Sequence, residues 1–156
     1  MQIHQVTHLP SQISALEKEA VAEGFRFITR LTSEWHSGTN RFDAPGECLM
    51  AVYLDRKLVG IGGLSIDPFT HARTGRLRRV YVVPTSRGQQ IGRQLVSALL
   101  AHAALYFESV RLYTDTSEGS TFYLRCGFTR TEDAQATHIV QLKKLSQSQL
   151  AVKSGQ

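Results

Sequence analysis

The stretch from residue 77 to residue 93 constrains the fold of this chain most strongly. An apolar strand at 77–83 is stopped by Pro84, and a turn containing Gly88 leads into a long amphipathic helix. The first turn of a helix carries backbone N–H groups without partners and the positive end of the helix dipole. Gly88 allows close approach to the backbone. This stretch therefore predicts a cradle for a phosphate or diphosphate group.

Patterning along the rest of the chain predicts one α/β domain over residues 1–142, followed by a polar tail at 143–156. The expected order is β-α-α-β-β-β-α-β-α-β-β, which implies a mixed central sheet of about seven strands with helices on both faces. The expected strands are 3–8, 48–54, 58–66, 77–83, 109–114, 128–131 and 137–142. The expected helices run from about 11 to 23, from 25 to 35, from 88 to 106 and from 120 to 125. Helical spacing places one apolar face of the first helix at Ile13, Leu16 and Ala20, and one face of the long helix at Ile91, Leu95, Leu99 and Ala103, with Val96 and Leu100 beside it. The apolar runs on either side of the tight turn at 55–57 predict a hairpin.

Charge and composition narrow the class of protein. The net charge of +5 and the pI of about 9.5 suit an anionic partner, which composition alone leaves open between nucleic acid, a membrane surface and a phosphorylated ligand. No uninterrupted apolar run reaches the roughly 20 residues of a membrane span, and the first residues lack a secretory pattern. Cys48 and Cys126 are too few for a disulfide framework and are interpreted as core thiols. We expect a cytoplasmic protein that does not contact a membrane.

Other chemistry-bearing motifs are incomplete. A Walker A loop is absent, and the Gly60-Ile61-Gly62 start of a dinucleotide fingerprint lacks its third glycine and its helix. His4 and His8 lie on a predicted strand without the glutamate of a zinc motif, so no metal site is expected. No zinc finger, KH loop or RNP aromatic pair is present, which disfavours a nucleic-acid-binding domain.

Two short motifs resemble those of the GNAT superfamily of acyl-CoA-dependent N-acyltransferases. Arg87-Gly88-Gln89-Gln90-Ile91-Gly92 resembles Arg/Gln-x-x-Gly-x-Gly/Ala at the start of the main helix, with Gln90 in place of the middle glycine. Glutamine keeps the main-chain N–H that binds phosphate in that superfamily, and it is a good helix former. Tyr123-Leu124-Arg125-Cys126-Gly127-Phe128 resembles Tyr-x-x-x-Gly-Phe. The two motifs occur in the family order, and the resemblance covers about residues 3–142.

The resemblance implies acetyl-CoA as co-substrate, with pantetheine between the central strand and the next strand, which splay apart. A main-chain N–H near Val82 would polarise the thioester carbonyl and hold the oxyanion. Tyr123 would protonate the leaving CoA thiolate as general acid, and the amine would attack the thioester directly. The implied cofactor-binding residues are Val80, Tyr81, Val82, Val83, Arg87, Gly88, Gln89, Gln90, Ile91, Gly92 and Arg93.

The acceptor and the general base remain open from the sequence. Strand alternation predicts Arg76, Arg78, Val80 and Val82 on one face and Leu77, Arg79, Tyr81 and Val83 on the other, with no carboxylate on either. Candidate bases elsewhere are Asp67, Glu34, His36, Asp115 and His138. The arginines either recruit an acidic acceptor or form a solvated, phosphate-complementing edge.

The resulting hypothesis is an N-acetyltransferase that moves an acetyl group from acetyl-CoA to a primary amine of a small molecule, a peptide or a protein. The alternative is a non-catalytic acyl-CoA-binding module of the same fold. We expect neither nucleic acid nor a membrane as partner, and exposed strand edges leave a homodimer open.

Overall fold

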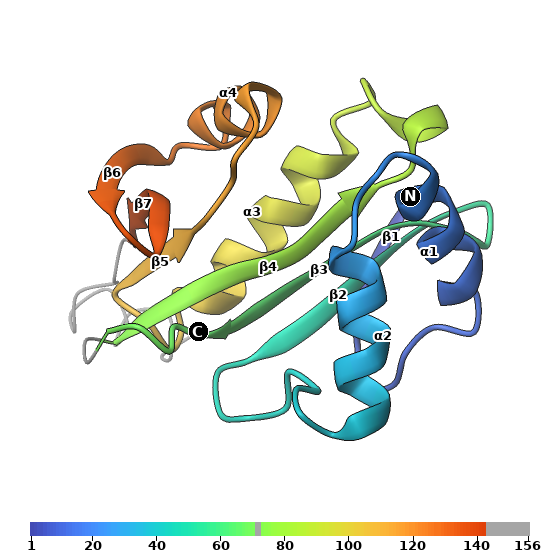
Figure 1. Cartoon of the computed structure of the whole chain (residues 1–156), viewed down its shortest axis with the longest axis horizontal. Helices are drawn as coiled ribbons and strands as arrows, with labels where there is room; N and C mark the ends of the chain where they lie inside the picture. The colour runs from blue at the N-terminus through green and yellow to red at the C-terminus, as the bar shows by residue number, and fades with distance from the viewer. Residues whose placement is uncertain (71–72, 143–156) are drawn as a thin grey trace, which may run out of the picture.

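A computed structural model describes residues 1–70 and 73–142 of the chain (Figure 1). The predicted tail at 143–156 lies outside the described residues. Seven strands form one mixed sheet in the order β1-β2-β3-β4-β5-β7-β6, which confirms the predicted fold class. The strands are β1 (Gln2–Val6), β2 (Cys48–Leu54), β3 (Lys57–Ile66), β4 (Thr74–Val82), β5 (Ser109–Leu112), β6 (Thr129–Asp133) and β7 (Ala136–Gln141).

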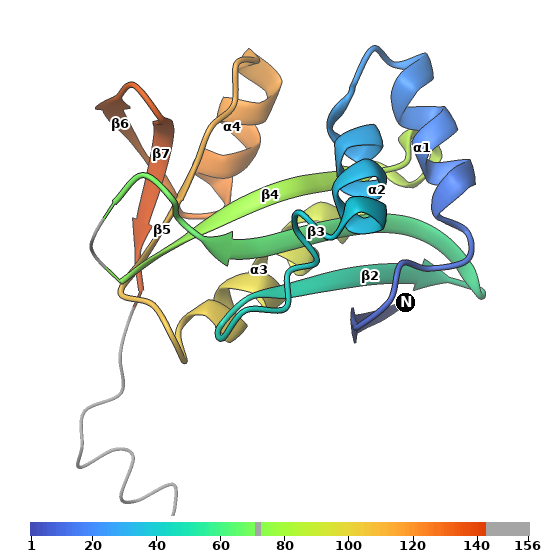
Figure 2. The same cartoon turned by 60° about the horizontal axis from the view of Figure 1, so that its bottom comes forward.

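Helices cover both faces of the sheet. They are α1 (Ile13–Ala22), α2 (Phe27–Ser37), α3 (Ile91–Ala103) and α4 (Ser117–Arg125), with a short 3₁₀ helix at Pro84–Ser86. A Cβ at Gly62 would point at Leu99 of α3, whereas a Cβ at the next residue, Gly63, would meet Phe42 just after α2. Because side chains alternate along a strand, α3 covers one face, and α1 and α2 cover the other (Figures 1 and 2). Within the described residues, no helix is long and apolar enough to cross a membrane.

The core lies on both sides of β2, β3 and β4. The predicted inner face of the first helix is confirmed, because Ile13, Leu16 and Ala20 are buried. The predicted inner face of the long helix is confirmed as well, and its buried residues are Ile91, Leu95, Val96, Leu99 and Ala103. The hairpin of β2 and β3 pairs from Cys48–Leu64 to Leu54–Lys57, as the apolar runs around a tight turn predicted.

The centre of the sheet opens between β4 and β5. These two strands pair in parallel only where Thr74, Gly75 and Arg76 face Ser109, Val110 and Arg111. Beyond Arg76, β4 continues for six residues while β5 ends at Leu112. The splay implied by the family resemblance is therefore present, and it leaves one edge of β4 without a neighbouring strand (Figure 1).

A β-bulge in β4 corrects the predicted alternation of its faces. Ile61 pairs with Tyr81 and Gly63 with Arg78, so two steps along β3 correspond to three along β4. The extra residue brings Arg79 to a left-handed φ of 61°. As a result Arg78 shares the α2 face with Tyr81, opposite Gly63, while Val80 lies 3.3 Å from the Cβ position of Gly62 on the α3 face. The expectation that Arg78 shares a face with Val80 and Val82 was wrong, because strict alternation does not survive an inserted residue.

Candidate active site

A cleft of about 1470 Å³ runs through the splay between β4 and β5. The loop before α3, the start of α2 and the β6–β7 turn all contribute to its lining. Most of the predicted site residues line it: Val80, Tyr81, Val82, Arg87, Gly88, Gln90, Ile91, Gly92, Arg93 and Tyr123. Val83 and Gln89 do not. Val83 is buried, and its N–H donates to the carbonyl of Val59 at 2.8 Å.

The N-terminus of α3 supplies the predicted anion cradle. The first hydrogen bond of the helix runs from the N–H of Gln94 to the carbonyl of Gln90 at 3.0 Å. The N–H groups of Ile91, Gly92 and Arg93 therefore have no acceptor within the described chain, and no side chain caps the helix. Together with the helix dipole, these three donors can bind a phosphate group.

The loop before α3 differs from the predicted continuous helix. The helix begins at Ile91 rather than Gly88, and Gln90 is its N-cap with a φ of 65°. Gln90 therefore occupies the left-handed region that favours glycine, and its helix propensity is irrelevant there. Gly88 is also left-handed, at a φ of 81°, and a Cβ there would meet no atom within 4 Å. Conformation rather than room requires glycine at 88.

These two positions predict opposite effects of substitution. Gln90→Gly removes a left-handed side chain and is expected to raise the free energy of unfolding by about 0.5–1 kcal/mol. Gly88→Ala introduces the same strain and is expected to lower it by about 1 kcal/mol. Urea unfolding of the two variants and the wild type measures both. A loss of stability in Gln90→Gly would contradict the left-handed backbone at that residue.

Arg87 lines the cleft and is held by hydrogen bonds to the end of α1 and to β4. Its Nη1 and Nη2 atoms pair with the Glu23 carboxylate at 2.7 and 2.8 Å, and its Nε donates to the carbonyl of Val82 at 3.0 Å. The hydroxyl of Tyr81 donates to the same carboxylate at 2.5 Å. The Arg87 guanidinium lowers the pKa of Glu23, which keeps the carboxylate ionised. Glu23 and Arg87 thus join the end of α1 to the phosphate loop.

The backbone of Val82 faces the splay. Val83 donates its N–H to β3, and successive N–H groups along an antiparallel strand point to opposite edges. The N–H of Val82 therefore points away from β3, toward the edge of β4 that β5 has left. Its side chain lies on the α3 face, with a methyl carbon 3.8 Å from the Cβ position of Gly92. This donor is available to a carbonyl oxygen lying in the cleft.

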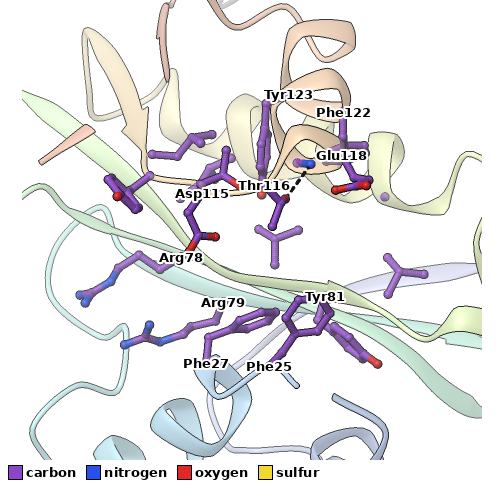
Figure 3. A pocket seen from close by; sticks show the side chains of 18 of the residues that line it. Phe25, Phe27, Arg78, Arg79, Tyr81, Asp115, Thr116, Glu118, Phe122 and Tyr123 are labelled. Atoms are coloured by element: carbon purple, nitrogen blue, oxygen red, sulfur yellow. Dashed lines mark hydrogen bonds between the residues drawn. The ribbon is translucent and has the colours of Figure 1, made fainter. Parts of the chain in front are cut away.

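Tyr123 enters the cleft from α4, across the splay from β4 (Figure 3). Its ring packs edge-on against Phe122 and Phe128, at centroid distances of 5.0 and 5.7 Å. Its hydroxyl makes no hydrogen bond within residues 1–70 and 73–142. Burial raises the pKa of the Tyr123 phenol, so that the group holds its proton at neutral pH. A protonated hydroxyl without a protein partner can donate to a group in the cleft.

The five candidate bases differ in whether they line the cleft and in whether other side chains already bind them. Asp67 is fully buried against Arg76 and Arg111, and Glu34 is bonded to Arg79 at 2.8 Å. Both ring nitrogens of His138 contact hydroxyls, those of Ser120 and Thr137, at 3.0 and 2.8 Å. None of these three residues lines the cleft, and neither does His36. Asp115, just after β5, is the one candidate that lines it.

The two cysteines do not offer a nucleophile. Burial, with a contribution from Glu47, raises the pKa of the Cys48 thiol to about 11. Burial also raises the pKa of Cys126, against the opposing charge of Arg93. Both thiols are free, and both stay protonated at neutral pH, which agrees with their interpretation as structural residues.

Several residues of the cleft could not be found from the sequence. Arg26, Phe27 and Arg30 line it at the start of α2, and Gln135 lines it from the β6–β7 turn. Glu23 contacts the phosphate loop from 64 positions away. No local pattern marks these residues, because only the folded chain brings α1, α2 and the β6–β7 turn to the splay.

The fold and the cleft define a class: an α/β domain with a split central sheet and an anion-binding helix N-terminus at the opening. The sequence profile of the GNAT acetyltransferase domain matches residues 45–130, which is more than half of the chain. The chain belongs to the GNAT acetyltransferase family, as the two motifs predicted. Membership supports acyl transfer from a CoA-type donor.

Solved structures share this fold. A protein from Exiguobacterium sp. 255-15, assigned to the acetyltransferases, superposes with a TM-score of 0.81 at 23% identity, with 97% of both chains covered. A GNAT-family acetyltransferase from Staphylococcus aureus Mu50 has a TM-score of 0.69 at 14% identity, covering 91% of this chain and 100% of that one. An aminoglycoside 6′-N-acetyltransferase in complex with coenzyme A has a TM-score of 0.70 at 16% identity, covering 94% and 99%. A search of curated protein sequences finds no match.

Proposed function

We propose that this protein is an acetyltransferase that moves the acetyl group of acetyl-CoA to a primary amine. The observation that carries the proposal is the cleft, which joins three free N–H groups at the start of α3, the N–H of Val82 and the hydroxyl of Tyr123. A diphosphate fits the first, a thioester carbonyl the second and a leaving thiolate the third. The coenzyme A complex of the structurally similar aminoglycoside 6′-N-acetyltransferase supports a donor of this type for the same fold.

The residues of the chain would act as follows. Ile91, Gly92 and Arg93 bind the diphosphate through their N–H groups, and the N–H of Val82 stabilises negative charge on the carbonyl oxygen. The amine nitrogen bonds to the carbonyl carbon, the carbon–sulfur bond breaks, and Tyr123 gives its proton to the sulfur. The attacking amine has to lose its proton. Asp115 and Glu118 are the carboxylates that line the cleft, and Asp115, already a candidate base from the sequence, would accept this proton directly or through water.

Binding of acetyl-CoA tests the donor site. At 100 times its dissociation constant, acetyl-CoA is expected to stabilise the wild type by about 2.7 kcal/mol, which raises Tm by several degrees. Arg93→Glu places a negative charge beside the cradle and is expected to weaken binding by about ten-fold or more, so the shift shrinks. Arg93 is preferable to Gly92 for this purpose, because a Cβ at Gly92 would lie 3.1 Å from the ring of Phe122 and disturb α4.

Arg56→Glu is the matched control, since it makes the same charge change in the exposed turn between β2 and β3. If acetyl-CoA raised the Tm of Arg93→Glu and Arg56→Glu equally, the assignment of the phosphate cradle to the start of α3 would be wrong. A shift with acetyl-CoA but no release of free CoA across a panel of amines would favour the non-catalytic acyl-CoA-binding module instead.

A further inference from the structure

The part of the cleft that is lined by α2 and β4 carries an excess of positive charge. Arg26 and Arg30 line it from the start of α2, and Arg78 and Arg79 line it from β4. Glu34 neutralises Arg79 through a 2.8 Å ion pair. The side chains of the other three arginines make no hydrogen bond or ion pair within the described chain. This part of the cleft therefore presents guanidinium groups that have no partner within the described chain, and a bound ligand would meet them.

Arg78 is the least exposed of these three guanidinium groups. It is half-buried, whereas Arg26 and Arg30 are exposed. None of its nitrogens is sealed away from solvent without a partner, so the group opens into the cleft. Burial, followed by repulsion from Arg79, lowers the pKa of Arg78, against the weaker opposing attraction of Glu34, Glu47 and Asp67. None of these carboxylates pairs with it directly, and a half-buried guanidinium without a hydrogen-bonded partner is one that an incoming anion would stabilise.

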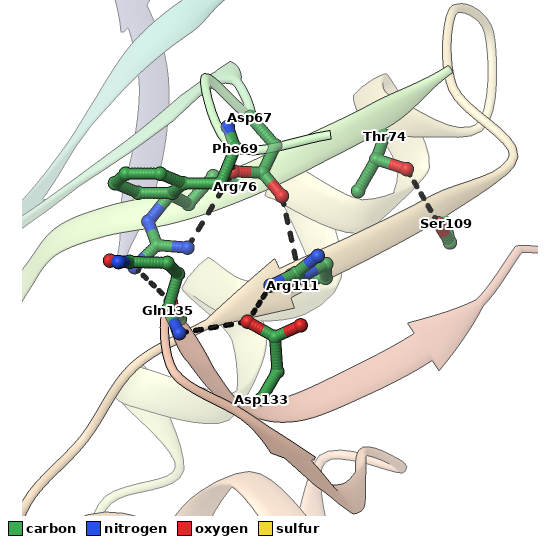
Figure 4. A network of polar contacts seen from close by, with 8 residues as sticks. All are labelled: Asp67, Phe69, Thr74, Arg76, Ser109, Arg111, Asp133 and Gln135. Carbon is green, nitrogen blue, oxygen red and sulfur yellow. Dashed lines mark hydrogen bonds and ion pairs between the residues drawn. The ribbon is translucent and has the colours of Figure 1, made fainter. Parts of the chain in front are cut away.

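The other two arginines of β4 have structural roles, because their side chains are bonded to neighbouring segments. Arg76 donates to the carbonyl of Gln135 at 2.8 Å and lies 3.7 Å from Asp67, so it ties β4 to the β6–β7 turn (Figure 4). Arg79 is fixed to α2 through Glu34. Arg78 has no such tie. Of the three arginines on β4, it is the one left for a ligand.

We propose that the acceptor amine also carries an anionic group, a carboxylate or a phosphate, and that Arg78 binds it. The planar guanidinium matches either oxyanion with two parallel hydrogen bonds. Phe25 and Phe27 line the same part of the cleft beside Tyr81 and give the acceptor an apolar wall (Figure 3). This inference rests on the proposed function and names the class of its acceptor.

The position of Arg78 along β4 also sets the shape of that acceptor. Val82 lies four positions further along the strand, which corresponds to about 13 Å of extended chain, less the shortening at the bulge. The reacting amine lies near Val82, so the anionic group is not directly adjacent to it. A small extended amine, with its anion several bonds from the nitrogen, fits this arrangement better than a simple α-amino acid.

Anion binding to the CoA-loaded protein tests the inference without knowledge of the acceptor. CoA is added to saturation so that it fills the cradle at α3, and inorganic phosphate or succinate is then titrated by calorimetry. Arg78→Gln is expected to weaken the binding of the preferred anion by about ten-fold or more, and Arg78→Lys by less, since it keeps the charge without the planar fork. Arg56→Gln, which removes a charge far from the cleft, should stay within about two-fold of wild type.

The two probes distinguish a phosphate from a carboxylate acceptor, since the tighter one identifies the group. Binding of both anions to Arg78→Gln as tightly as to wild type, or binding of neither to wild type, overturns the inference. Binding of CoA in the first step shows that each variant is folded, and it tests the donor site of the proposed function separately from the anion site. Where CoA fails to bind, the same titrations on the protein alone still compare wild type with Arg78→Gln, so the anion site is judged independently.

Discussion

Replacing Tyr123 with phenylalanine is expected to lower kcat for acetyl transfer by about 10²- to 10⁴-fold, the range for removal of a general acid. The ring contacts with Phe122 and Phe128 survive the substitution, so the fold and the affinity for CoA should change little. The hydroxyl has no partner within the described chain, so its loss leaves no orphaned protein group. Steady-state kinetics with acetyl-CoA, together with calorimetric binding of CoA, measures the two quantities separately.

A matched control and a change of donor separate proton transfer from packing. Tyr106→Phe makes the same chemical change at an exposed tyrosine after α3 that does not line the cleft, and kcat should be unaffected. An acetyl thioester with a more acidic leaving thiol depends less on protonation by Tyr123. With such a substrate, Tyr123→Phe should therefore lose less activity than with acetyl-CoA. A loss of kcat below about three-fold in Tyr123→Phe would reassign this residue to packing alone.

Much of the fold was predictable because its signals are local. The period of 3.6 identified the buried faces of α1 and α3, and apolar runs around a tight turn identified the hairpin of β2 and β3. The phosphate loop and the Tyr123 motif are each contained within a few consecutive residues. For the same reason, most of the residues that these motifs predicted for the site line the cleft in the structure.

The parts that could not be predicted depend on pairing between distant segments. The bulge at Arg79 exists because β3 and β4 advance by different numbers of residues, and no glycine in the sequence announces it. Gln90 adopts a left-handed backbone at a position where composition favours a helix. The ion pair of Arg87 with Glu23 joins the phosphate loop to the end of α1, and no local pattern in either segment indicates it. The bulge and the Glu23–Arg87 ion pair are tertiary contacts, which local preferences do not encode.

Asp67 illustrates the same limit, because its surroundings make it a structural ion rather than a base. Its carboxylate is fully buried at the end of β3, 3.3 Å from the Nε of Arg111 and 3.7 Å from Arg76 (Figure 4). It also accepts a hydrogen bond from the N–H of Phe69 at 3.2 Å. Arg111 and Arg76 in turn contact the β6–β7 turn, through Asp133 at 3.0 Å and the carbonyl of Gln135 at 2.8 Å. Asp67 is thus the shared anion that holds β4 and β5 together below the splay.

Asp67→Ala is therefore expected to lower the free energy of unfolding by about 3–5 kcal/mol, because it leaves two largely buried guanidinium groups without their common counter-ion. Urea unfolding of variant and wild type measures the loss. Asp67→Asn keeps the volume and the hydrogen-bond acceptor for Phe69 but not the charge. If the charge is what stabilises the fold, this variant should lose nearly as much stability as Asp67→Ala. Asp133→Asn removes an exposed partner of the same network and should cost much less. Unchanged stability of Asp67→Ala together with a large fall in kcat would instead return Asp67 to the candidate bases, and would mean that β4 and β5 are held together by their three backbone pairs alone.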